Sequence, residues 1–212
     1  ERLTPPVKPE DLAALLDQME ADGRHDLRLA TGLIALFGLR PAELAVLTVK
    51  EGKLYAGAVK RNIATLAQKS KPPRLCLPLD IAGREGEGKR LLHLYESGLV
   101  KMPTAVLNEI SKVEDKGTFQ QVGHAFGQLL KRYEPWKNLV RSNEGVTPYS
   151  LRHSWAYRCH VCSNNALHVR TAAALMGHTV AVHMKHYGSW VDEASLEAAV
   201  ERYNEGLVAV QQ

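Results

Sequence analysis

Apolar residues at helical spacing fill the first part of the chain. A stripe of leucines and a methionine predicts a helix over residues 9–22. Residues 26–37 are apolar on most sides, which is typical of a helix inside a core, and Gly38 is a typical end for such a helix. Pro41 suits the first turn of a further helix. We therefore expect Arg40 at the junction between two helices.

Further along the chain, apolar and polar residues alternate, as they do in strands. Glu51-Gly52 is a turn signal, and the segments 53–60 and 74–79 both show this alternation. The connection between them, 61–73, is long and basic. These segments predict a small antiparallel β-hairpin or sheet.

Helical periodicity returns after Gly88 and continues towards the C-terminal end. Thr147 is expected to cap a helix that has Pro148 at its first position. The predicted helices of this part are 89–97, 104–112, 119–133, 148–162, 168–176 and 192–203. The predicted fold class is mainly α with a small antiparallel β-hairpin or sheet, an α+β fold.

Composition limits the class of protein. With 212 residues and 45% hydrophobic content, the chain can bury one sizeable core. It has neither the run of about 20 apolar residues that spans a bilayer nor the apolar core of a signal peptide, so we expect a cytoplasmic protein. The formal net charge of +4 is compatible with a polyanionic partner, but such an excess is also common on solvated surfaces.

The three cysteines give no sign of a disulfide framework. Cys76, Cys159 and Cys162 are few and unevenly spread, which favours a reducing compartment. Cys159 and Cys162 flank His160, but no second ligand pair stands at the spacing of a zinc site. We therefore predict buried structural thiols, no metal and no cofactor.

Four separated segments carry candidate chemistry. They are GLRPAEL around Arg40, a hairpin with lysines, YSLRHSWA around Arg152, and LMGHTVAVHMKHY, in which Tyr187 follows His178 by nine residues. In this order they resemble the catalytic domain of the tyrosine site-specific DNA recombinases, the phage integrase family, over nearly the whole chain. The resemblance implies that family's catalytic-domain fold.

The resemblance also implies a role for each residue. Tyr187 is the nucleophile that becomes joined to DNA, and its phenol, with an ordinary pKa of about 10, needs assistance near neutral pH. Arg40 and Arg152 bind the non-bridging phosphate oxygens, because the guanidinium fork suits such oxygens. His178 contributes to the setting that stabilises the phenolate, and Glu43 supports Arg40. Neither metal nor ATP is required.

A hairpin lysine is the general acid that the resemblance implies for the leaving sugar oxygen. Two lysines are candidates. Lys60 ends the strand-like segment at about the usual distance beyond the turn, and we prefer it. Lys69, close before the second alternating segment, is the alternative.

The sequence departs from the family pattern at Tyr149, where the family has a histidine. On a helix Tyr149 shares a face with Arg152, so its hydroxyl can still donate a hydrogen bond to phosphate. It cannot act as an acid or base near neutral pH as histidine does. We expect His153 to point elsewhere on the helix, and His183 and His186 to face DNA or solvent.

The favoured function is a recombinase or integrase that cuts and rejoins DNA through a covalent 3′-phosphotyrosine, for integration or excision of a mobile element in a bacterium or phage. The alternative is a catalytically decayed DNA-binding relative with a regulatory role. A type IB topoisomerase is a third possibility, which GLRPAEL and LMGH disfavour.

The expected partners are double-stranded DNA, further copies in a synaptic tetramer, and accessory DNA-bending proteins, with the protein associated with the nucleoid. Residues 1–8 are expected to be a linker from a missing N-terminal DNA-binding domain, and 9–190 the catalytic domain. The C-terminal helix and tail, 191–212, are expected either to dock onto a neighbouring protomer or to pack back on the core.

Overall fold

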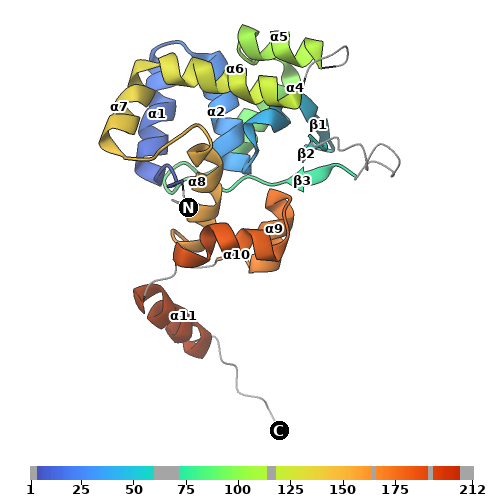
Figure 1. Cartoon of the computed structure of the whole chain (residues 1–212). Coiled ribbons are helices and arrows are strands. Elements are labelled where there is room, and N and C mark those ends of the chain that lie inside the picture. The colour runs from blue at the N-terminus through green and yellow to red at the C-terminus, as the bar shows by residue number, and fades with distance from the viewer. Residues whose placement is uncertain (1–3, 60–71, 114–117, 164–165, 191–192, 206–212) are drawn as a thin grey trace.

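A helical body carries a small sheet on one side, and the C-terminal helices lead away from it (Figure 1). This computed structural model describes residues 4–59, 72–113, 118–163, 166–190 and 193–205. Its elements, in chain order, are α1 (Pro9–Ala21), α2 (His25–Phe37), the 3₁₀ helix η1 (Pro41–Val46), β1 (Leu47–Lys50), β2 (Lys53–Ala56), β3 (Arg74–Cys76), α4 (Glu87–Ser97), α5 (Thr104–Lys112), α6 (Phe119–Arg132), α7 (Glu134–Ser142), α8 (Ser150–His160), α9 (Val169–Met176), α10 (Val180–Tyr187), the 3₁₀ helix η2 (Gly188–Trp190) and α11 (Glu193–Glu205).

Helix α2 is the centre of the core. Every residue from Leu27 to Phe37 is buried, and α1, α4 and α8 pack around the helix. Gly38 ends it in the left-handed conformation, with φ of 65°. The prediction of a core helix that stops at this glycine is therefore confirmed, and the chain leaves α2 directly towards Arg40.

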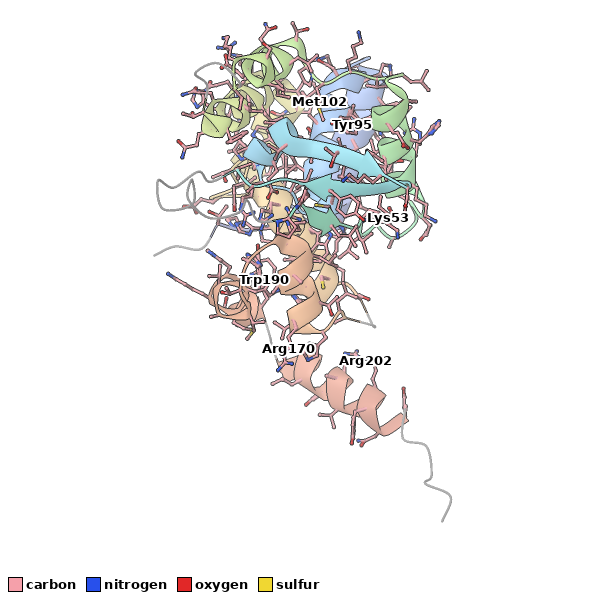
Figure 2. All side chains as sticks on the ribbon, turned by 90° about the vertical axis from the view of Figure 1, so that its right-hand side faces the viewer. Lys53, Tyr95, Met102, Arg170, Trp190 and Arg202 are labelled. Carbon is pink, nitrogen blue, oxygen red and sulfur yellow. The ribbon has the colours of Figure 1, made fainter. Side chains whose placement is uncertain are left out.

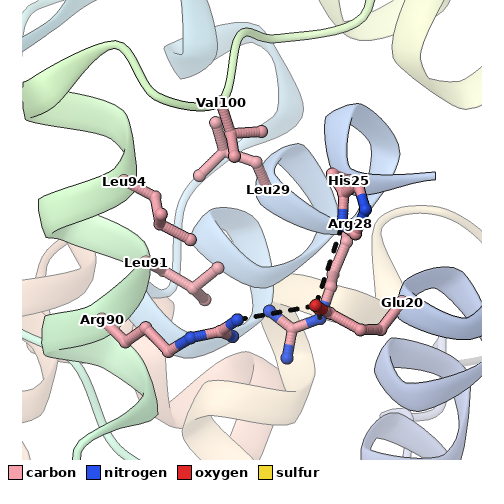
Figure 3. A pocket seen from close by; sticks show the side chains of 8 residues that line it. All are labelled: Glu20, His25, Arg28, Leu29, Arg90, Leu91, Leu94 and Val100. Carbon is pink, nitrogen blue, oxygen red and sulfur yellow. Dashed lines mark ion pairs between the residues drawn. The ribbon is translucent and has the colours of Figure 1, made fainter. Parts of the chain in front are cut away.

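A buried arginine joins the three N-terminal helices. Arg28 of α2 has Nε 2.8 Å from Glu20 of α1 and Nη2 2.5 Å from Glu87 of α4. Figure 3 shows the same carboxylate of Glu20 in a second ion pair with Arg90 of α4. Because breaking a buried ion pair leaves an uncompensated charge, these contacts favour one relative arrangement of the three helices.

The sheet has the order β1-β2-β3, and both pairs of strands are antiparallel. Glu51 and Gly52 both have positive φ, as a two-residue hairpin turn requires. Leu54 and Cys76 pair across the sheet and are fully buried. Figure 2 shows this sheet in front of the helical body, with Lys53 labelled at the turn. The predicted antiparallel sheet is confirmed, although β2 and β3 are shorter than the alternating segments.

Side chains of helix α8 bind this helix to the helical body through hydrogen bonds. Trp155 Nε1 donates a hydrogen bond to the carbonyl of Leu77, 3.2 Å away. Arg158 donates to the carbonyls of Ala35 and Leu79, at 2.6 and 3.2 Å. A buried helix that donates to carbonyls of separate segments is held in position by directional bonds as well as by packing.

The start of α8 differs from the prediction. The helix begins at Ser150, because the amides of Ser150 and Leu151 bond to carbonyls three residues back, as in tight turns. The hydroxyl of Ser150 accepts from the Thr147 amide, so Thr147 is not the cap. The prediction of buried thiols is correct for Cys159 and wrong for Cys162, which is exposed because α8 ends two residues earlier.

The last helix, α11, extends away from the body in Figure 1. Its apolar residues Leu196, Val200 and Tyr203 share a face at spacings of four and three residues, and all are exposed. The expectation that this helix packs back on the core is therefore wrong for these side chains. None of the described helices is long and apolar enough to cross a membrane.

Replacement of Gly38 should test the turn between α2 and η1. A Cβ at Gly38 would lie 3.0 Å from Trp155 Cγ, and the positive φ adds strain. We expect Gly38→Ala to lower the free energy of unfolding by about 3 kcal/mol, from strain and overpacking together. Gly23→Ala is the matched control, because Gly23 has φ of 68° and open space around its Cβ position. If urea denaturation shows that Gly38→Ala and Gly23→Ala lose the same free energy of unfolding, the expected clash with Trp155 is contradicted.

Candidate active site

The site begins at η1, where the Glu43 carboxylate accepts two hydrogen bonds from Arg40. The amide of Arg40 donates to Glu43 Oε2 at 2.7 Å, and its Nη1 donates to Glu43 Oε1 at 2.8 Å. Pro41 starts the 3₁₀ helix, which brings the two side chains together three residues apart. Arg40 lies at the junction between α2 and η1, as predicted, and its bonds to Glu43 fix the direction of its side chain.

Glu43 is buried among three arginines. Arg74 Nη2 lies 2.6 Å from its Oε2, and Arg152 Nη1 lies 3.9 Å from the same oxygen. Burial by itself raises the pKa of this carboxyl, but the charges of Arg74, Arg152 and Arg40 outweigh burial and lower the pKa. Glu43 is therefore a carboxylate at neutral pH, and it offsets one of the three positive charges.

The same three arginines bind the C-terminal end of α9. Arg74 Nη1 donates to the carbonyl of Leu175 at 2.5 Å, and Arg152 Nη2 donates to that of Met176 at 2.5 Å. Arg40 Nη2 donates to the carbonyl of Gly177, the next residue, at 3.0 Å. Carbonyls at a helix end lack partners within the helix and carry a partial negative charge, which suits guanidinium groups.

The two arginines predicted to bind phosphate differ in their exposure. The side chain of Arg40 is 30% exposed, whereas that of Arg152 is 1% exposed. Arg152 Nη1 also donates to the carbonyl of Gly38, at the end of α2. Arg40 therefore has the more accessible guanidinium of the two, whereas Arg152 holds the ends of α2 and α9 together.

Tyr187, at the end of α10, is a buried residue with a histidine partner. Its Oη lies 2.9 Å from Nδ1 of His153, and the side chain is 4% exposed. The expectation that His153 points elsewhere on α8 is therefore wrong. Tyr149 precedes His153 by one helical turn, and their rings meet edge to face at 5.1 Å. His153 thus lies between the two tyrosines.

His178 and His183 form a second histidine contact beside Tyr187. His178 Nε2 lies 2.7 Å from His183 Nδ1, and the centres of the His183 and Tyr187 rings are 4.7 Å apart. His183 is 1% exposed, so the expectation that it faces DNA or solvent is wrong. It lies four residues before Tyr187, on the same face of α10.

Burial and positive neighbours determine the protonation of these groups. Burial, together with the charges of Arg152 and His186, lowers the pKa of His153 to about 4. Burial lowers the pKa of His178 to about 3, again with Arg152 as the largest contributing charge. Burial raises the pKa of Tyr187 to about 12 despite the nearby arginines. Near neutral pH both histidines are neutral and Tyr187 is a phenol.

Most of the predicted site residues come together. Those whose contacts or charges meet at this site are Arg40, Glu43, Tyr149, Arg152, His178 and Tyr187. The candidate lysines Lys60 and Lys69 lie outside the described residues. Among the residues that the structure describes, no group of three His, Cys, Asp or Glu is arranged to hold a metal ion.

Three residues of the site were not identified from the sequence. His153 and His183 carried a usable signal, because each lies four residues from a tyrosine of the site and so shares a helix face with it. Arg74 carried none. It reaches Glu43 across 31 residues from β3, and a strand arginine is an ordinary surface residue.

Comparison of the whole fold gives its class. The crystal structure of XerA recombinase superposes with a TM-score of 0.58 at 15% identity, covering 96% of this chain and 66% of the other. The chain has the catalytic-domain fold of the tyrosine recombinases.

A sequence relative agrees with this class. The chain is 27% identical over 167 residues to Excisase A of Nostoc sp. (strain PCC 7120 / SAG 25.82 / UTEX 2576). The match covers 77% of this chain but only 31% of that relative. No protein-family model matches the chain.

Replacement of Glu43 should test whether its charge holds the arginines together. Glu43→Gln keeps the shape of the side chain but leaves three neighbouring arginines without their shared carboxylate. We expect a loss of about 3–5 kcal/mol in the free energy of unfolding, as for one half of a buried ion pair. Glu134→Gln is the control: Glu134 pairs with Lys137 and Arg141 on the surface and should give no measurable change. A Glu43→Gln protein as stable as the control would contradict this role.

Proposed function

We propose that this chain is the catalytic domain of a site-specific DNA recombinase that cuts and rejoins strands through a covalent 3′-phosphotyrosine on Tyr187. Integration or excision of a mobile element is the reaction we favour. The observation that carries the proposal is the convergence of Arg40, Arg152, His178 and Tyr187, from four separate parts of a recombinase fold. Residues of these types fit attack by a phenol on a phosphodiester.

In the proposed reaction, the cluster of arginines receives the scissile phosphate. Arg40 offers the guanidinium that is open to solvent, and Arg152 contributes when it exchanges a carbonyl partner for a phosphate oxygen. Each group then stabilises the extra negative charge of the transition state. Tyr149 remains 40% exposed beside them and can donate its hydroxyl to the same phosphate.

His153 is the group that we propose accepts the proton of Tyr187 during attack. The tyrosine oxygen bonds to phosphorus and its proton moves to Nδ1 of His153, where the negative charge of the bound phosphate offsets the new positive charge. The bond from phosphorus to the sugar oxygen breaks, and that oxygen takes a proton from a lysine. Lys60, or Lys69 in its place, supplies that last proton in the proposal. Rejoining reverses each transfer, so the reaction consumes no ATP.

The DNA partner and self-association are part of the same proposal. The exposed apolar face of α11, formed by Leu196, Val200 and Tyr203, is a surface that a second copy can cover. We propose that α11 docks onto a neighbouring protomer when copies assemble on DNA. Accessory DNA-bending proteins are further expected partners.

Covalent trapping tests the nucleophile. The protein is incubated with a nicked duplex that carries the attachment site, without metal or ATP, and the products are separated on a denaturing gel. We expect a protein–DNA adduct with the natural protein and none with Tyr187→Phe, which keeps the ring but lacks the attacking oxygen. If both proteins bind the DNA and neither forms an adduct, the decayed DNA-binding relative becomes the better reading.

The pH dependence of adduct formation tests His153. Because the pKa of His153 is about 4, its imidazole stays neutral throughout pH 6–9 and is available to take the proton of Tyr187. The rate of the natural protein should therefore be flat over this range. In His153→Leu the reaction depends on the small phenolate fraction of Tyr187, whose pKa is about 12. We expect a rate roughly 10²–10⁴-fold lower at pH 7, rising about tenfold for each pH unit.

His93→Leu is the matched control for this profile, since His93 is exposed on α4, away from the site. Its rate and profile should equal those of the natural protein. A flat profile in His153→Leu as well would show that another group takes the proton.

A further inference from the structure

A chain of three imidazoles leads from the candidate active site to the end of α8. His178 Nε2 lies 2.7 Å from His183 Nδ1, and His183 Nε2 lies 2.7 Å from His160 Nε2. The rings meet nearly at right angles at both steps, at 75° and 74°. His183, in the middle, is buried and has both of its ring nitrogens engaged by histidines from other elements.

The hydrogen-bonding capacity of imidazole limits where the protons of these three histidines can lie. A neutral ring has one N–H donor and one acceptor nitrogen, so His183 must donate to one neighbour and accept from the other. If Nδ1 of His183 donates to Nε2 of His178, the proton of His178 must be on Nδ1. If the direction is reversed, the proton is on Nε2 and Nδ1 is an acceptor. The direction of the chain therefore fixes the tautomer of His178.

The surroundings keep these three rings neutral near neutral pH. Burial is the largest cause of the lowered pKa of each ring, which falls to about 3 for His178 and about 4 for His183. Burial also lowers the pKa of His160. Charges that add to this effect on His178 and His183 come from Arg40, Arg152, His160, His183 and His186. The packed ring of Tyr187 is itself uncharged near neutral pH.

We infer that His183 and His160 are positioning residues that hold His178 with its proton on Nδ1, where it can donate to a phosphate oxygen of DNA. This inference rests on the proposed function. His178 directly follows Gly177, whose carbonyl binds Arg40, so a phosphate at Arg40 lies close to His178. A neutral N–H donor there adds a hydrogen bond without adding a fourth cation beside Arg40, Arg74 and Arg152.

The experiment reads the tautomers directly. Protein labelled with ¹⁵N-histidine is studied by long-range ¹H–¹⁵N correlation at pH 7, and the signal of His178 is assigned by its loss in His178→Gln. We expect His178 to be neutral with a protonated Nδ1 and a bare Nε2. In His183→Leu this tautomer should no longer be fixed, and the rate of adduct formation should fall about 10–100-fold, the range found when the supporting partner of a metal-bound histidine is removed.

Two variants separate positioning from folding. His183→Gln has an amide that can still donate to Nε2 of His178, so it should keep the Nδ1–H tautomer and most of the rate. If His183→Leu does not fold, His160→Leu removes the half-buried last histidine of the three and should likewise leave the tautomer of His178 unfixed. The exposed control His93→Leu should leave both readouts unchanged.

Two results would overturn the inference. One is a charged His178, or one with its proton on Nε2, in the natural protein. The other is an unchanged tautomer in both leucine variants. If instead the tautomers are as expected and the natural protein forms no adduct, the proposed function fails while the hydrogen-bonded chain stands.

Discussion

The C-terminal end of α9 is the point on which the rest of the site depends. Three consecutive carbonyls, of Leu175, Met176 and Gly177, each accept a hydrogen bond from a different arginine. These arginines come from β3, α8 and the start of η1, which are far apart in the sequence. Glu43 contacts or faces all three of them. One helix end and one carboxylate thus determine where the sheet, α8 and η1 meet.

This arrangement explains how so much positive charge is tolerated in a buried place. One carboxylate cannot neutralise three guanidinium groups, but the partial negative charges of the carbonyls at the end of α9 add to its effect. The remaining positive potential disfavours further cations, which is why Arg152 contributes to the lowered pKa of His153, His178 and His183. An environment that keeps its histidines neutral is also one that an anion stabilises. The site is therefore electrostatically suited to a phosphate.

Helices α1 and α2 could be predicted from their apolar stripes, whereas α7 and α10 were not predicted. Residues 9–22 and 26–37 formed helices as expected because their leucines face a core. Helix α10 was missed because its buried positions are His183 and Tyr187, which give no apolar period. Strand β2 stops at Ala56, four residues short of the alternating segment.

The same distinction holds for the site. Arg40, Arg152, His178 and Tyr187 could be selected because a known family shares their order and spacing. Arg74 could not, since it contacts Glu43 across 31 residues, and the contact of His153 with Tyr187 spans 34 residues. Such contacts exist only after the fold has formed, so no local pattern encodes them. The i, i+4 spacing of His183 and Tyr187 was visible, but its partners on other elements were not.

That shared face of α10 has a consequence for the proposed reaction. Tyr187 is buried against His153, so attack on DNA requires its hydroxyl to leave this partner or the phosphate to approach it closely. His183 lies on the same short helix, while its partners His178 and His160 lie outside it. Any movement of α10 that carries Tyr187 towards DNA therefore also shifts His183 against both partners. The position of Tyr187 and the tautomer of His178 are in this way linked through a single helix.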